Sequence, residues 1–87
     1  MKVLILKDGT VIENGQAGYA EGFLWLYIFG YTMAQAASTF LDTSKTETIV
    51  FRYGEDMETT YQGYTDCINL NIDIDGKLSV CLRKGVA

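Results

Sequence analysis

The segment that most constrains the fold of this chain is Phe23–Phe29, in which all seven residues are aliphatic or aromatic. Glycines bracket it, at positions 22 and 30. Its length and its aromatic and β-branched content favour a strand over a buried helix. Because apolar residues would lie on both faces, we expect this strand to be buried on both sides, in the centre of a sheet.

A second reading of this region is a membrane span, because residues 22–41 carry no charge over a length that could cross a bilayer. The second half of the stretch contains Thr32, Gln35 and Ser38, and no basic residues flank either end to orient it. Thr32 and Gln35 have the spacing of a capping box, in which each side chain bonds the backbone of the other. The sequence therefore favours a strand followed by a helix.

The predicted helix covers residues 33–41 and carries one apolar stripe at i, i+3, i+4, i+7 and i+8. We expect this stripe to pack on the sheet, since a helix of about ten residues is marginal without packing. The polar residues 42–44 are expected to form a turn that ends the helix. The stripe consists of Met33, Ala36, Ala37, Phe40 and Leu41.

The remaining segments predict hairpins. Residues 3–6 and 10–13 form two strands joined at Asp8-Gly9, and residues 47–53 and 57–61 form two more. The glycine-rich residues 14–22 are expected to form a loop. The fold class is therefore α+β, with a mainly antiparallel sheet of six or seven strands and one short helix on one face. The predicted order of elements is β-β-β-α-β-β-β-β.

The last hairpin, residues 67–73 and 77–83, allows two registers. A two-residue turn would pair apolar with polar side chains, whereas a three-residue loop with Gly76 in the left-handed region keeps the apolar residues together. We therefore predict the three-residue loop. It pairs Ile72 with Leu78, Leu70 with Val80, and Ile68 with Leu82.

Composition excludes several classes of function. The chain has 87 residues, which we read as a single domain over residues 1–87, and its net charge is −4. An acidic chain is a poor match for nucleic acid or for anionic lipid. Histidine is absent, which excludes Ser-His-Asp and Cys-His catalysis and histidine metal sites. We expect no cofactor and no enzymatic activity.

Two local patterns have a chemical and a structural reading. Asn71, Asp73 and Asp75 resemble the start of a calcium loop, but the twelfth position is Leu82 rather than glutamate, and a turn explains the same residues. In the predicted register Cys67 lies opposite Arg83, which would lower the pKa of its thiol. No general base accompanies it, so an enzymatic role for Cys67 is the weakest hypothesis.

The candidate binding residues lie between Gly54 and Gly76, a segment rich in carboxylates and without lysine or arginine. Acidic groups beside tyrosines suit a basic protein surface, although solvated strand faces would show the same composition. The predicted contact residues are Glu55, Asp56, Glu58, Tyr61, Tyr64 and Asp66. If nothing covers the aromatic side of the central strand, an alternative surface consists of Phe23, Trp25 and Tyr27.

The layout of turns and apolar segments resembles small proteins encoded in phages and prophages of Gram-positive bacteria. The residues that carry the resemblance are Asp8-Gly9-Thr10, Ile49-Val50-Phe51, Tyr61-Gln62-Gly63-Tyr64-Thr65, Asp75-Gly76 and Leu82-Arg83-Lys84. It implies a non-enzymatic role, and some small acidic phage proteins inhibit host defence, as anti-CRISPR proteins do.

Two functional hypotheses follow. The first is a protein-binding module that inhibits a host defence complex by contacting a partner with a basic surface. The second is a self-associating subunit of a virion or of its assembly machinery. The expected location is the cytoplasm of the host cell or the virion.

Overall fold

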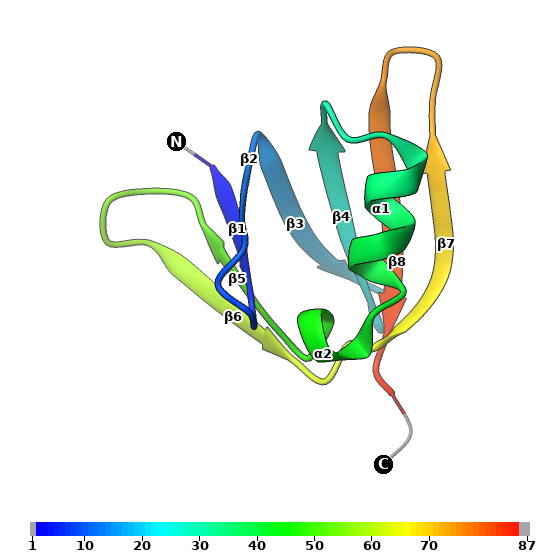
Figure 1. Ribbon diagram of the computed structural model, residues 1–87. Coiled ribbons are helices and arrows are strands. Elements are labelled where there is room, and N and C mark those ends of the chain that lie inside the picture. The colour runs from blue at the N-terminus through cyan, green and yellow to red at the C-terminus, as the bar shows by residue number, and fades with distance from the viewer. Residues whose placement is uncertain (1, 86–87) are drawn as a thin grey trace.

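A computed structural model describes residues 2–85 and shows an α+β fold of mainly antiparallel strands (Figure 1). Eight strands form two four-stranded sheets, with the orders β2-β1-β5-β6 (sheet A) and β3-β4-β8-β7 (sheet B). The predicted single sheet with one helix is therefore wrong in detail, because the chain forms two sheets and two helices. Sheet A contains β1 (Val3–Leu6), β2 (Val11–Glu13), β5 (Thr48–Arg52) and β6 (Glu58–Gln62). Sheet B contains β3 (Gly15–Ala20), β4 (Phe23–Phe29), β7 (Asp66–Ile72) and β8 (Lys77–Arg83).

The predicted loop over residues 14–22 is wrong, because Gly15–Ala20 forms strand β3 at the edge of sheet B. Only Asn14 separates β2 from β3, and there the chain passes from sheet A to sheet B. Asn14 adopts a positive φ of 57°, which asparagine tolerates better than most residues. Glycine content alone predicted a loop, but these glycines are accommodated in an edge strand and at a tight corner.

Strand β4 is confirmed as an interior strand, lying between β3 and β8. Its predicted burial on both faces is wrong. Leu24, Leu26 and Ile28 are fully buried between the sheets, whereas the alternate aromatic residues are half-buried or exposed. The apolar run therefore has one core face and one outer face.

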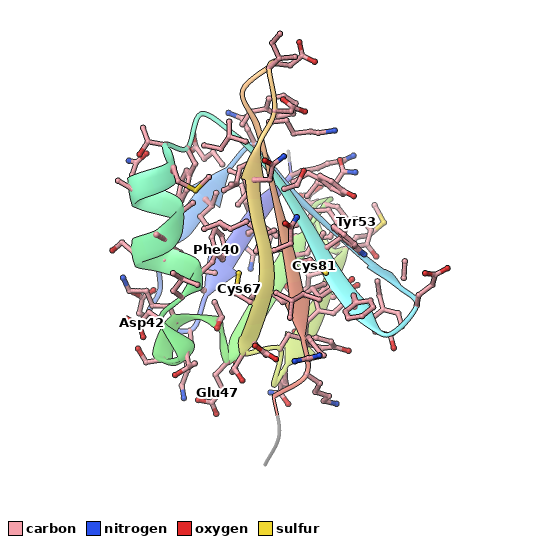
Figure 2. All side chains as sticks on the ribbon, turned by 90° about the vertical axis from the view of Figure 1, so that its right-hand side faces the viewer. Phe40, Asp42, Glu47, Tyr53, Cys67 and Cys81 are labelled. Carbon is pink, nitrogen blue, oxygen red and sulfur yellow. The ribbon has the colours of Figure 1, made fainter. Side chains whose placement is uncertain are left out.

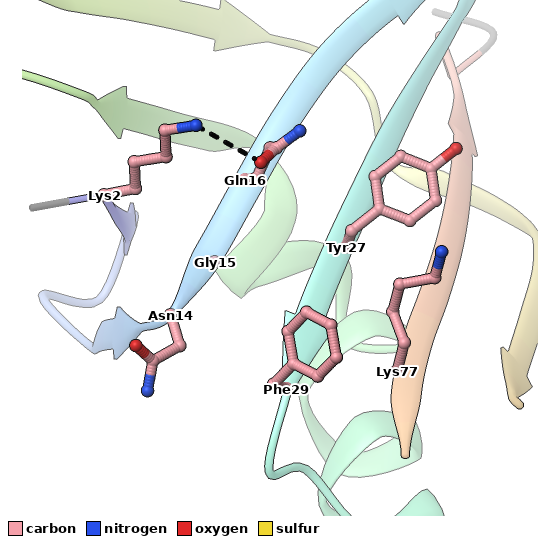
Figure 3. A pocket seen from close by; sticks show the side chains of 7 residues that line it. All are labelled: Lys2, Asn14, Gly15, Gln16, Tyr27, Phe29 and Lys77. Carbon is pink, nitrogen blue, oxygen red and sulfur yellow. Dashed lines mark hydrogen bonds between the residues drawn. The ribbon is translucent and has the colours of Figure 1, made fainter. Parts of the chain in front are cut away.

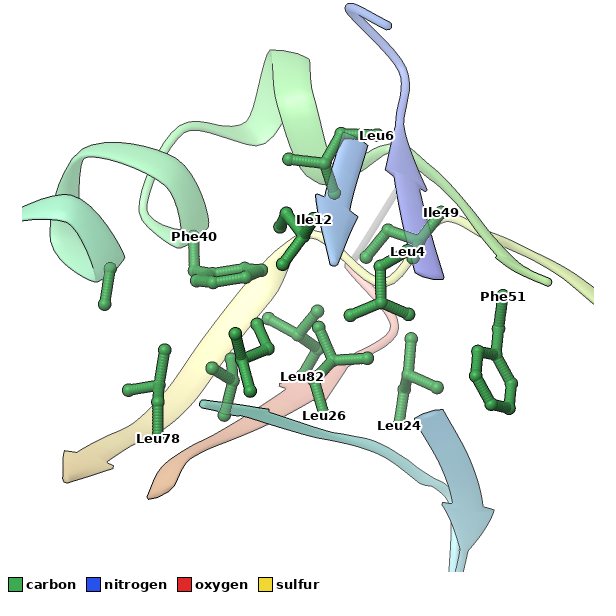
Figure 4. Close-up of a cluster of buried hydrophobic side chains, with 13 residues drawn as sticks. Leu4, Leu6, Ile12, Leu24, Leu26, Phe40, Ile49, Phe51, Leu78 and Leu82 are labelled. Atoms are coloured by element: carbon green, nitrogen blue, oxygen red, sulfur yellow. The ribbon is translucent and has the colours of Figure 1, made fainter. Parts of the chain in front are cut away.

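Helix α1 (Met33–Phe40) confirms the predicted helix and its capping box. Ala36 and Phe40 are buried, and Figure 4 shows Phe40 pointing into the space between the two sheets beside Ile12. The ends of the predicted stripe do not pack, since Met33 and Leu41 are 44% and 62% exposed. In Figure 1 the helix lies in front of β8, between β4 and β7, so it covers part of the inner face of sheet B.

The predicted turn at residues 42–44 is instead the start of α2 (Thr43–Thr46). Asp42 caps this short helix by accepting a hydrogen bond from the Ser44 amide. Within residues 2–85, no helix is long and apolar enough to cross a bilayer. Residues 22–41 instead contribute a strand and a short helix.

All three predicted hairpins are present, and the first and the last are also confirmed in their turns. Thr10 donates its amide hydrogen to the Asp8 carboxylate, and Gly9 has a φ of 90°. In the last hairpin Gly76 is left-handed, and Ile72 pairs with Leu78 and Leu70 with Val80. The third predicted pair is wrong, because a bulge between Cys67 and Asn69 places Cys67 opposite Leu82.

Candidate functional site

The outer face of sheet B carries a row of four aromatic side chains from one strand. We call it the aromatic face and define it by Phe23, Trp25, Tyr27 and Phe29, the alternate residues of β4 that point away from the core. No layer of residues 2–85 covers it, because sheet A and α1 both pack on the opposite side of sheet B. Phe29 is 53% exposed and the other three are half-buried.

Residues on the neighbouring strands frame the aromatic face. Lys77, Ser79, Cys81 and Arg83 of β8 lie opposite Phe29, Tyr27, Trp25 and Phe23. The Lys77 ammonium lies 5.1 Å from the centre of the Tyr27 ring, a cation–π contact. At the other end, Arg83 forms an ion pair with Asp66. The four strands of sheet B contain no other carboxylate than Asp66.

A pocket of about 520 Å³ opens at the Phe29 end of the aromatic face (Figure 3). We call it the Phe29 pocket. Lys2 and Lys77 lie on opposite sides of it, with Gln16 and Tyr27 between them. Its lining residues are Lys2, Asn14, Gly15, Gln16, Tyr27, Phe29 and Lys77. It therefore combines two ammonium groups with two aromatic rings.

The structure separates the acidic residues that the sequence grouped together. Glu55, Asp56 and Glu58 lie at the β5–β6 hairpin, where Glu58 pairs with Arg52. Asp66 lies on sheet B and pairs with Arg83. These carboxylates do not form one face, and two of the four are paired with arginine. A contact with a basic partner through the Glu55–Asp56 tip stays a prediction.

The two predicted tyrosines belong to a different cluster. Tyr64 makes edge-to-face contacts with Tyr19 and Tyr61, with ring centres 6.3 Å apart in each pair. Both Tyr61 and Tyr64 are half-buried, and burial raises the pKa of Tyr61. Lys84 lies over the Tyr64 ring at 5.8 Å. Tyr61 lies at the end of β6 that is distant from the Glu55–Asp56 turn, and both tyrosines pack beside the core.

The structure opposes a reactive thiolate at Cys67. The bulge turns Cys67 toward the core and places Asp66, not Cys67, opposite Arg83. Burial raises the pKa of the Cys67 thiol and of the Cys81 thiol above the ordinary value of 9.0. Figure 2 shows both side chains beside β7 and β8. Neither thiol is activated as a nucleophile.

The candidate calcium loop serves as a turn. One carboxylate oxygen of Asp73 accepts hydrogen bonds from the amides of Asp75 and Lys77, at 2.9 and 3.0 Å. Within residues 2–85, no three acidic, cysteine or histidine side chains gather in a way that could hold a metal ion.

The alternation along the sequence placed all four aromatic residues of β4 on one face, but the predicted surface included only three of them and left out Phe29, the most exposed member. It also missed Lys2, Gln16 and Lys77, which come from three different segments. The sequence placed Lys77 on the outer face of the last predicted hairpin. It did not show that β8 pairs with β4, so Lys77 could not be placed beside Phe29. Comparison with known proteins adds nothing to this picture: no family model, no curated protein and no solved structure matches the chain.

Proposed function

We propose that this chain is a non-enzymatic protein-binding module of phage or prophage origin that binds a host protein through the aromatic face. The observation that carries the binding role is the uncovered row of four aromatic side chains on one strand. Aromatic residues are enriched at protein interfaces because they bury a large area at a small cost in conformational entropy. The resemblance to phage proteins supports a component of a host defence complex as the partner.

Charge indicates the chemistry of that partner. Lys2 and Lys77 form no ion pair with any residue of the described chain, and Arg83 is already paired with Asp66. A second copy that packed its aromatic face on this one would bring further lysines, and the single carboxylate on the four strands of its sheet B, Asp66, is already paired with Arg83. The complementary surface is therefore apolar and flanked by carboxylates, and it belongs to a different protein.

Photo-cross-linking tests this proposal. A benzoylphenylalanine is placed at Ser79, which faces outward beside Tyr27, and at Ser38 on helix α1 as a matched control. After irradiation in a Gram-positive host lysate, we expect one host protein, identified by mass spectrometry, to cross-link from position 79 only. The additional substitution Phe29→Thr should abolish this product.

Two results would overturn the proposal. Equal cross-linking from positions 79 and 38 would mean that the aromatic face is not the contact surface. A product that consists only of two copies of the chain would favour the self-associating virion or assembly subunit.

A further inference from the structure

The Phe29 pocket indicates which chemical groups of the partner would bind there, an inference that rests on the proposed function. Its volume of about 520 Å³ is within the range of ligand-binding pockets. The floor is aromatic: Phe29 is 53% exposed, and the Tyr27 ring lies under the Lys77 ammonium. The pocket can therefore bury an apolar side chain and hold charged groups at its sides.

The charges of the pocket have one sign. Lys2 donates a hydrogen bond to the Gln16 side-chain oxygen at 3.5 Å, which leaves its other two donors available. Asp73, in the turn before Lys77, accepts hydrogen bonds from the amides of Asp75 and Lys77 through one carboxylate oxygen. Among residues 2–85, no acidic side chain lines the pocket, although the whole chain has a net charge of −4. The pocket is a local cationic site on an acidic protein.

The pocket is held by the fold rather than by flexible loops. Gly15 packs without a side chain against Leu4 of the core, and Asn14 adopts the left-handed conformation that turns the chain from sheet A to sheet B. This corner places the Gln16 side chain beside the aromatic end of β4, and the Lys2 ammonium, from the segment before β1, donates a hydrogen bond to it (Figure 3). The polar groups on one side of the pocket are thus fixed relative to Phe29.

We propose that the Phe29 pocket binds an acidic peptide segment of the partner, with an apolar side chain against Phe29 and Tyr27 and carboxylates reaching Lys2 and Lys77. Nucleic acid fits this site less well. A phosphate backbone needs a row of cations along its path, and the pocket has two lysines and no arginine fork. The net negative charge of the chain also repels a polyanion of high charge density.

The test is an NMR titration with two peptides, acetyl-Glu-Phe-Glu-amide and its uncharged match acetyl-Gln-Phe-Gln-amide. We expect the acidic peptide to bind more tightly and to shift the amide signals of Asn14, Gly15 and Phe29. Each exposed ion pair contributes a factor of about 1.4 to five, so the two together give about two- to 25-fold. The double substitution Lys2→Gln with Lys77→Gln should remove this preference.

The control is Lys84→Gln, which makes a charge change of the same kind beside Tyr64 and outside the pocket. It should keep the preference for the acidic peptide. Thermal unfolding of all variants checks that the fold is intact.

Each failure has a distinct reading. Equal affinity for the two peptides, with shifts still at Phe29, would overturn the acidic specificity and leave the aromatic face as the binding surface. A preference for the acidic peptide that survives in the Lys2/Lys77 double variant would overturn the placement of the carboxylates. Equivalent shifts with a ten-residue oligothymidine, lost in the same variant, would assign the pocket to nucleic acid. An acidic preference without any cross-link from position 79 would overturn the proposed function and keep the pocket.

Discussion

The corner between β2 and β3 gives a sharp prediction about stability. A Cβ atom at Gly15 would lie 2.8 Å from Leu4 Cδ1 and 2.9 Å from Leu4 Cγ. Leu4 is fully buried among residues of both sheets, so it has no free space into which to move. The substitution Gly15→Ala therefore forces either the corner or the core to shift.

Gly18→Ala is a matched control on the same strand, because a Cβ there meets no atom within 4 Å and Gly18 does not have a positive φ. Overpacking a well-packed core costs about 1–3 kcal/mol. Replacing glycine by alanine in a strand contributes about 0.5–1 kcal/mol of stability through the unfolded chain, and this gain is common to both variants. We therefore expect Gly15→Ala to be less stable than Gly18→Ala by about 1–3 kcal/mol.

The assay is thermal and urea unfolding followed by the fluorescence of Trp25, the single tryptophan of the chain. For a domain of this size 1 kcal/mol corresponds to about 4–8 °C in Tm, so the two variants should differ by at least about 4 °C. If Gly15→Ala unfolds at the same temperature as Gly18→Ala or above it, the close contact with Leu4 does not constrain the corner, and the argument for a fixed pocket is refuted.

Three further predictions concern the core, the last turn and the thiols. Phe40→Ala should destabilise the domain by about 3–5 kcal/mol because the ring is fully buried, whereas Leu41→Ala, at a residue 62% exposed, should change the free energy of unfolding by less than about 0.5 kcal/mol in urea titrations. Asp73→Ala should cost about 1–2 kcal/mol by removing the acceptor of two turn amides, while Asp75→Ala, whose side chain accepts neither bond, should leave the urea midpoint nearly unchanged. Because burial raises the pKa of the Cys81 thiol above 9.0, the folded chain holds this proton more tightly than the unfolded chain. Stability should therefore fall as pH rises above about 9, less steeply in Cys81→Ala, and alkylation of Cys81 at pH 8 should be slower than that of the more exposed Cys67.

The parts of the fold that sequence predicts well are those set by neighbouring residues. The capping box of Thr32 and Gln35, the Asp8-Gly9 turn and the left-handed Gly76 all follow from local backbone chemistry, and all three are present. The strand character of Phe23–Phe29 follows from its composition and its bracketing glycines. Each of these features needs only a few consecutive residues.

The parts that were wrong depend on contacts distant in sequence. Gly15–Ala20 forms a strand because it pairs with the edge of β4. The intrinsic strand propensity of its residues does not predict this pairing. The division into two sheets depends on β1 pairing with β5 and β4 pairing with β8, which join residues 43 to 60 positions apart. The bulge at Cys67 moved one predicted pair by a single residue, and this reversed the expected surroundings of the thiol.

The candidate site was predicted in part. The alternation along β4 identified Phe23, Trp25 and Tyr27 as a possible surface, and the structure shows that no described layer covers them. Grouping acidic residues by their closeness in sequence was less informative. The segment between Gly54 and Gly76 contains β6, which belongs to sheet A, and β7, which belongs to sheet B. Glu58 pairs with Arg52, which is close to it in sequence. Asp66 pairs with Arg83, which is 17 residues away, so closeness in sequence did not reveal that ion pair.

The position of β4 between β3 and β8 also has a consequence for synthesis on the ribosome. One edge of β4 can pair with β3 as soon as residues 15–29 have emerged, but the other edge waits for residues 77–83, which are translated about 50 residues later. Until then a seven-residue apolar segment without charge or proline has an open edge, which is the signature of an aggregation-prone strand. Chains truncated before β8 should therefore aggregate. Pairing of β8, the last strand to be translated, closes the open edge of β4 and protects the nascent chain from aggregation.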